Sequence, residues 1–95
     1  MVRPMLTEAE RARGIRLGET LRDARGDRPA TEVAAASGVP VDTLRKIESG
    51  RIPTPAFFTV VALARALDLP IERLLDLDVP TAAEQDGADE QRRTA

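Results

Sequence analysis

The chain has 95 residues and a formal net charge of −2, and it contains neither cysteine nor histidine. This length allows one domain with a small core. Without cysteine, the chain can form neither disulfides nor thiolate metal sites. No stretch approaches the roughly 18 apolar residues of a membrane span, and the first ten residues lack the apolar segment of a signal peptide. We therefore expect a cytoplasmic protein with no membrane contact.

The side chains that serve most enzymes are scarce. Ser37 and Ser49 are the only serines, and there is no histidine to act as a general base. We expect no enzyme, no metal site and no cofactor. The only aromatic residues are the adjacent Phe57 and Phe58, whereas single-stranded nucleic acids are usually bound on several aromatic side chains. This argues against an RNA binder or a single-stranded DNA binder.

A first helix is predicted to begin after Thr7 and to continue to about Arg25. Thr7 and Glu10 have the spacing of a capping box, in which each side chain bonds the backbone N–H of the other residue. Gly14 and Gly18 should weaken this helix, each by about 1 kcal/mol relative to alanine. Its apolar stripe comprises Ile15, Leu17, Leu21 and Ala24.

The next stretch predicts two short helices joined by a glycine turn. Residues 26–29 end the first helix, and a second helix should span about Ala30 to Ala36. Gly38 supplies the positive φ that a tight turn requires. A third helix should span about Val41 to Ser49, with Gly50 as its stop. Two helices in this arrangement, the second with a charged outer face, are what a helix-turn-helix reader of duplex DNA requires.

Two further helices complete the predicted domain. Thr54 should cap a fourth helix that has Pro55 in its first turn. Residues 68–70 should end it, and a fifth helix should span about residues 71–77. The fourth helix has an apolar face of Phe57, Val60, Val61, Leu63, Ala64 and Leu67. The fifth should bury Ile71, Leu74 and Leu75.

The ends of the chain have a different composition. Residues 1–6 show no periodicity, and we expect a flexible N-terminal lead. Beyond Pro80 there is no large apolar residue, so burial cannot offset the entropy of ordering, and residues 80–95 should form a disordered tail. The predicted fold is therefore all-α, with one domain at residues 7–79.

Charge is distributed unevenly. Residues 1–52 hold ten basic and eight acidic residues, whereas residues 53–95 hold four basic and eight acidic residues. The half with the predicted reading helix is thus the more positive one. Its excess is small, so we expect moderate DNA affinity that depends strongly on salt.

Two segments carry a family pattern. EVAAASGVPVDTLRKIESGRIPTP, residues 32–55, and LARALDLPIERLL, residues 63–75, resemble the XRE-type, or Cro-like, helix-turn-helix family of phage repressors and bacterial transcription regulators. The pattern combines the spacing of Ala34 and Gly38, a leucine-rich final helix and the ending of the third helix. That ending consists of Leu44, Ile47, Glu48 and Gly50.

The resemblance implies a five-helix lambda-repressor-like DNA-binding domain whose third helix enters the major groove. It implies backbone contacts near Arg51 and from the amide end of the fourth helix around Thr54. It also implies an ion pair between Glu48 and Arg22. The implied base contacts come from Val41, Asp42, Thr43, Arg45 and Lys46.

The chain departs from the family pattern in three places, one of which is the loop from Gly26 to Pro29, one residue longer than the common spacing. Ala30 stands where a glutamine usually touches phosphate, and we expect Arg28 to replace that contact. Asp68 stands where a glycine usually ends the fourth helix.

Several residues keep a second interpretation. Arg45 and Lys46 can be solvated helix residues, Asp42 can serve as an N-terminal dipole partner, and Val41 can pack internally. Phe57 and Phe58 can belong to the core or to a subunit contact. The reading helix has neither Asn nor Gln, so direct readout should favour G·C pairs, because Arg and Lys prefer guanine and Asp accepts from cytosine.

The predicted function is a sequence-specific transcription regulator, such as a repressor, acting on the nucleoid. One short helix reads few base pairs, so we expect a homodimer on a palindromic operator. Its seam should consist of Leu74, Leu75, Leu77 and Val79. Two alternatives remain: an antitoxin whose tail binds a toxin or another protein partner, and a protein-interaction module that has lost DNA binding.

Overall fold

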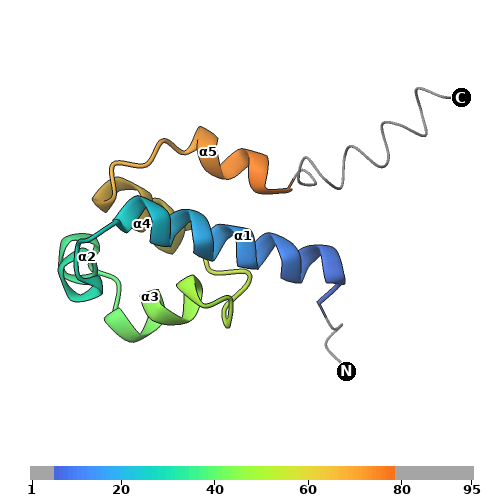
Figure 1. The fold of residues 1–95 in the computed structure, drawn as a ribbon, viewed down its shortest axis with the longest axis horizontal. Helices are drawn as coiled ribbons and strands as arrows, with labels where there is room; N and C mark the ends of the chain where they lie inside the picture. The colour runs from blue at the N-terminus through green and yellow to red at the C-terminus, as the bar shows by residue number, and fades with distance from the viewer. Residues whose placement is uncertain (1–5, 79–95) are drawn as a thin grey trace, which may run out of the picture.

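The computed structural model describes residues 6–78, which are all-helical as the sequence predicts. This part of the chain has five α-helices, a short 3-10 helix (η1) and no strand (Figure 1). Val79, the expected tail at 80–95 and residues 1–5 of the expected lead lie outside it. The elements are α1 (Glu8–Arg25), α2 (Ala30–Ser37), α3 (Val41–Glu48), α4 (Phe57–Ala66), α5 (Glu72–Leu75) and η1 (Asp76–Asp78).

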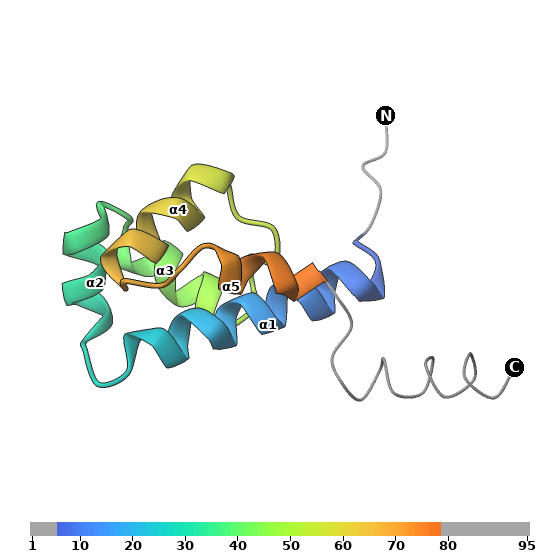
Figure 2. The ribbon, with the colours of Figure 1, turned by 90° about the horizontal axis from the view of Figure 1, so that it is seen from above.

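The long helix α1 is the centre of the arrangement. Helix α3 lies along one side of α1, whereas α5 and η1 lie along the other side (Figures 1 and 2). Helix α2 sits at the end of α1 and packs on both α3 and α4. One continuous core joins these helices. It comprises Leu17, Leu21, Val33, Val39, Leu44, Ile47, Leu63 and Leu67.

The start of α1 is confirmed in detail. The Glu10 backbone N–H donates to Thr7 Oγ1 at 3.0 Å, and the Thr7 N–H donates to Glu10 Oε1 at 2.8 Å. The bond from the Thr7 N–H stabilises the carboxylate and, with a smaller contribution from the Thr7 side chain, lowers the pKa of Glu10. The capping bond to Glu10 therefore contributes fully to folding stability above the pKa that Glu10 has in the unfolded chain. This stability is lost as the pH falls through the lowered pKa of the folded state.

Gly14 and Gly18 serve packing rather than bending. Both are buried in an uninterrupted helix, and a Cβ at Gly14 would overlap Pro53. A Cβ at Gly18 would lie 2.5 Å from the carbonyl oxygen of Ile47 and 2.6 Å from that of Glu48. The missing side chains lower the helix propensity of α1, as expected from the sequence. The same lack of a Cβ lets the backbone of α1 approach its neighbours closely.

The second half of the chain corrects four expectations. Helix α4 begins at Phe57 after an N-cap at Ala56, not after Thr54, because the preceding loop stays against α1 at Pro53. Phe57 and Phe58 are 66% and 79% exposed, so they do not belong to the core.

Helix α5 is shorter than predicted, since η1 replaces its last turn. Two of the three residues it was expected to bury, Ile71 and Leu75, are exposed, while Leu74 is half-buried. Ile15 of the expected α1 stripe is also exposed. These apolar residues follow the helical period, but no element within residues 6–78 covers them.

Replacing Gly18 with alanine tests the close approach. Helix propensity alone predicts stabilisation by about 1 kcal/mol. We expect destabilisation by about 1–3 kcal/mol instead, because the new Cβ meets backbone rather than a flexible side chain. Urea unfolding measures the difference, and Glu19→Ala at the neighbouring exposed position should change stability by no more than about 0.5 kcal/mol. A more stable Gly18→Ala variant would contradict the packing role.

Candidate nucleic-acid interface

Helices α2 and α3 meet at a tight left-handed turn. Gly38 has φ 76°, and its N–H donates to the Ala34 carbonyl at 2.9 Å. The Ser37 hydroxyl accepts from the Val39 N–H at 3.2 Å. Val39 is buried directly after the turn. The positive φ at Gly38 is the one that the sequence predicts, and the buried Val39 anchors the chain in the core just before α3 begins.

Helix α3 has two distinct sides. Leu44 and Ile47, three residues apart, are completely buried, and they lie on the side that packs against α1 and α2. On the opposite side Asp42, Arg45 and Ser49 are exposed. With 100° between successive residues, Val41 and Thr43 fall on the two shoulders, where both are half-buried. The outward side is the candidate reading surface.

The end of α3 presents a further cation. Gly50, at φ 81°, reverses the chain, and the Arg51 N–H donates to the Lys46 carbonyl at 2.9 Å. Arg51 is therefore exposed at the end of α3. Thr54, the other predicted backbone contact beyond α3, is also exposed, but it lies in the loop and not at the first turn of α4.

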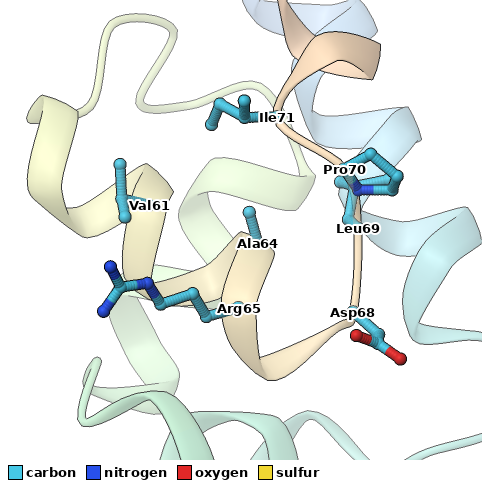
Figure 3. Close-up of a pocket in the computed structure, with 7 residues that line it drawn as sticks. All are labelled: Val61, Ala64, Arg65, Asp68, Leu69, Pro70 and Ile71. Atoms are coloured by element: carbon cyan, nitrogen blue, oxygen red, sulfur yellow. The ribbon is translucent and has the colours of Figure 1, made fainter.

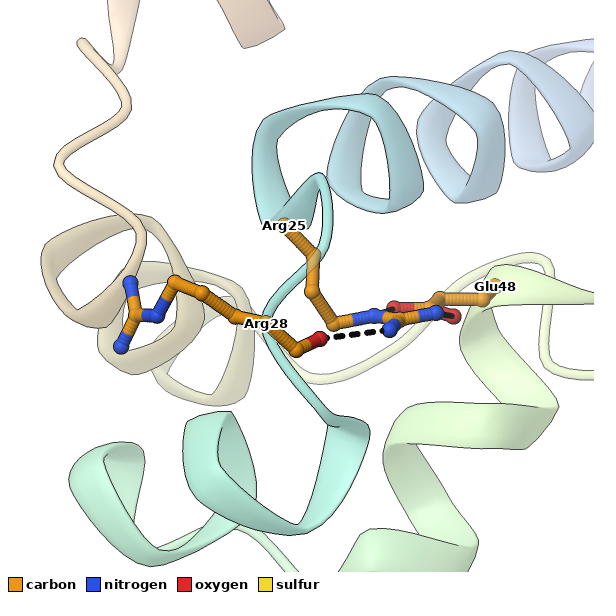
Figure 4. A network of polar contacts seen from close by, with 3 residues as sticks. All are labelled: Arg25, Arg28 and Glu48. Atoms are coloured by element: carbon orange, nitrogen blue, oxygen red, sulfur yellow. Dashed lines mark hydrogen bonds and ion pairs between the residues drawn. The ribbon is translucent and has the colours of Figure 1, made fainter.

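A bidentate ion pair fixes the end of α3 to α1. Arg25 Nε donates to Glu48 Oε2 at 2.8 Å, and Arg25 Nη2 donates to Glu48 Oε1 at 2.9 Å (Figure 4). Arg25 Nη1 also donates to the Arg28 carbonyl at 2.8 Å. The side chains are 18% and 8% exposed. The bonds to Glu48 raise the pKa of Arg25, so its charge persists at every physiological pH.

The predicted partner of Glu48 was wrong. Arg25 lies four residues after Leu21 and seven after Gly18, on the side of α1 that faces α3. Arg22 is turned about 100° from Leu21 and is exposed. The spacing from Leu21 along the apolar stripe was the signal that could have identified Arg25.

Arg28 binds inside the protein. Its Nε donates to Glu32 Oε1 at 3.1 Å, and its Nη1 donates to the Ala66 carbonyl at 3.0 Å. The second bond satisfies a carbonyl at the end of α4. Asp68 follows with φ 58°, the left-handed conformation that a glycine adopts more readily. The predicted phosphate contact of Arg28 would require its guanidinium to leave these partners.

The outward side of α3 carries an ion pair of its own. Lys46 Nζ lies 3.1 Å from Asp42 Oδ2, one helical turn away. The side chains of Lys46 and Asp42 are 44% and 78% exposed. In the described part of the chain, Arg45 and Arg51 have no acidic partner within 4 Å. The reading surface therefore combines two unpaired cations with one neutral pair.

Two hollows lie away from this surface. One, of about 470 Å³, separates the α3–α4 loop from α5, and its lining includes Pro53, Pro55, Leu74, Leu75 and Leu77. The other, of about 550 Å³, lies between α4 and the segment leading to α5 (Figure 3). Within residues 6–78 no group of acidic side chains could hold a metal ion, and no helix is long and apolar enough to cross a membrane.

The fold and this surface define a helix-turn-helix DNA-binding domain. Residues 16–77 match the family model of the helix-turn-helix domain, so the chain belongs to that family, within its XRE-like group. No curated protein matches the chain. The XRE-type resemblance is thereby confirmed.

Replacing Arg25 and Arg22 of α1, one at a time, distinguishes the observed ion pair from the expected one. Arg25→Met leaves the Glu48 carboxylate, 8% exposed, without its cation. We expect a loss of about 2–3 kcal/mol in unfolding free energy. The matched Arg22→Met variant should change it by no more than about 0.5 kcal/mol. Thermal or urea unfolding of both variants provides the measurement.

A double variant serves as the control. Arg25→Met/Glu48→Leu removes both charges, so it should recover much of the lost stability, because no charge stays buried alone. Equal losses for Arg22→Met and Arg25→Met would contradict the assignment.

Proposed function

We propose that this protein is a sequence-specific transcription regulator that reads the major groove of double-stranded DNA with α3. The observation that carries the proposal is the division of α3 into a wholly buried side and an exposed charged side. An eight-residue helix held this way can enter a groove about 12 Å wide without giving up its core contacts. The protein would act in the cytoplasm, on the nucleoid.

Base contacts are proposed from the outward side and the shoulders of α3. Arg45 and Lys46 are donors suited to guanine, and Asp42 is an acceptor suited to cytosine. Val41 and Thr43, at the shoulders, can contact a thymine methyl group. Arg51 and Thr54 lie exposed beyond the end of α3, where proposed contacts to the DNA backbone would set the register.

For Arg28 we propose a structural role first and a phosphate contact only second. Because its guanidinium already bonds Glu32 and the Ala66 carbonyl, its direct contribution is the position of α2. A phosphate contact from Arg28 would add to the DNA interface only if one of these bonds is exchanged.

A homodimer on a palindromic operator completes the proposal. Three residues of the predicted seam, Leu74, Leu75 and Leu77, lie in the described part of the chain. All three line the hollow between the α3–α4 loop and α5, and Leu75 is 66% exposed. An exposed leucine beside an apolar hollow is the kind of surface that a second copy can cover. Two copies would present two α3 helices to half-sites about 34–36 Å apart. Repression would then follow from occupancy of the operator.

One alternative function also has structural support. Phe57 and Phe58 are exposed and pack edge to face, with ring centroids 5.1 Å apart. Together with the net charge of −2, this patch favours a protein-interaction module that has lost DNA binding. The antitoxin alternative depends on residues 80–95, which lie outside the described residues.

Binding to random duplex DNA separates the leading function from the interaction module. The full chain should bind with an affinity that falls steeply with salt. Arg45→Ala/Lys46→Ala should reduce the slope of log K against log salt by about 1, because Arg45 is the unpaired cation of the two and each lost phosphate-neutralising cation removes about one released counterion. The readout is fluorescence anisotropy between 50 and 200 mM salt.

The matched control is Arg65→Ala/Arg73→Ala. It removes the same charge from exposed residues of α4 and α5, and α5 lies across α1 from the reading helix (Figure 1). Its slope should equal that of the unchanged protein. Absence of salt-dependent binding, or equal effects of the two double variants, would count against the reading role of α3.

The seam is tested by light scattering, free and on a palindromic duplex. Leu75→Glu should give a monomer, because a carboxylate cannot be buried in an apolar contact without a partner. Phe58→Glu, at the other exposed apolar patch, should leave the dimer intact. A monomer under both conditions in the unchanged protein would reject the dimer. A monomer from Phe58→Glu alone would move the seam to α4.

A further inference from the structure

The acid and base on the reading surface are already joined in the free protein. Asp42 Oδ2 and Lys46 Nζ lie 3.1 Å apart, and both side chains reach solvent. An exposed pair on one helix adds little to stability. Its consequence therefore lies in what it presents to a ligand: a carboxylate acceptor and an ammonium donor side by side.

The neighbours of this pair leave it facing outward. Asp42 and Lys46 are neighbours on the outward side of α3, and Arg45 and Ser49 lie beside Asp42 on that side. Glu48, the other acid of α3, is turned inward to Arg25. No other carboxylate of the described chain lies within 4 Å of Lys46. The pair can thus meet a base edge as one unit.

A C·G base pair presents the complementary pattern. In the major groove, the N4 amino group of cytosine donates and O6 of guanine accepts. These two atoms are joined by a hydrogen bond of the base pair, so they lie about 2.9 Å apart. Asp42 can accept from N4 while Lys46 donates to O6, and the four atoms then alternate donor and acceptor around a ring. Neither side chain needs to release the other.

The other base pairs fit this unit less well. An inverted G·C pair would set O6 against the carboxylate and the amino group against the ammonium. An A·T pair has the same donor and acceptor order, but adenine N7 lies beside N6 and repels the carboxylate. Thymine also places a methyl group beside O4, where guanine offers N7 as a second acceptor for Lys46. The chemistry therefore selects C·G in one orientation.

We propose that Asp42 and Lys46 together read a single C·G base pair, as one ion-paired unit. This inference rests on the proposed DNA-binding function and deepens it, since it assigns two residues of α3 to the same base pair. It also gives the acid on the reading helix a role, although its charge alone would repel DNA.

Selection of bound duplexes from a random pool, with the full chain, tests the unit. The unchanged protein should select a C·G pair within each half-site. Asp42→Ala and Lys46→Ala should each relax the preference at that same pair, by about 10-fold or more. The charge exchange Asp42→Lys/Lys46→Asp should favour the inverted pair, G·C, at that position.

A matched control removes the other exposed pair of the same spacing. Glu32→Ala breaks the pair with Arg28, also 3.1 Å long and also one helical turn in span. It should leave the selected sequence unchanged. Thermal unfolding checks each variant, and Asp42→Asn, which keeps the size of the side chain, replaces Asp42→Ala if the latter unfolds. Asn prefers adenine, so the C·G preference should weaken there too.

Several outcomes would overturn the inference. If the two single variants relax different base pairs, Asp42 and Lys46 read separately. If neither relaxes a C·G pair while the unchanged protein still selects duplexes, the pair is only a surface ion pair and the proposed function stands. If the unchanged protein selects no duplex, both the inference and the proposed function fail.

Discussion

The backbone of α1 approaches the end of α3 so closely at Gly18 that no side chain fits between them, and the position of α3 depends on this constraint. Helix α3 has only eight residues, so it cannot be stable alone and must take its stability from packing. Leu44 and Ile47, fully buried, contribute about 1.5–3 kcal/mol each. Contact along a single side is sufficient because α1 and α2 both pack against it, which leaves the other side open.

The Arg25 guanidinium connects the three elements around this contact. Two of its nitrogens hold Glu48 at the end of α3, and a third holds the Arg28 carbonyl just before α2. A lysine could not make these bonds in one plane, because the fork geometry belongs to guanidinium alone. Arg28 in turn holds the end of α4 through the Ala66 carbonyl. Fixing α2 and α3 relative to each other is what a reading helix requires, since a base contact demands a defined register.

Features of local chemistry could be predicted from the sequence, and features of tertiary packing could not. The capping box at Thr7, the left-handed Gly38 and the start of α3 at Val41 each depend on a few adjacent residues. The role of Gly18 depends on the backbone of a residue almost thirty positions away, and helix propensity assigned it the opposite sign. The predictions for Phe57 and for the length of α5 were wrong for the same reason. Apolar periodicity does not tell which element, if any, covers a face.

The charges of α3 explain how a chain of net charge −2 can carry the proposed DNA-reading surface. Its two acids are both neutralised within the protein, Glu48 by Arg25 and Asp42 by Lys46. The cations that remain for phosphate contacts are therefore Arg45 and the nearby Arg51. One copy of the protein thus offers few cations to DNA. Affinity grows with the number of neutralised phosphates, so one copy is expected to bind DNA weakly. The proposed dimer would double this number, while the proposed reading of one C·G pair by Asp42 and Lys46 would supply specificity without adding net charge.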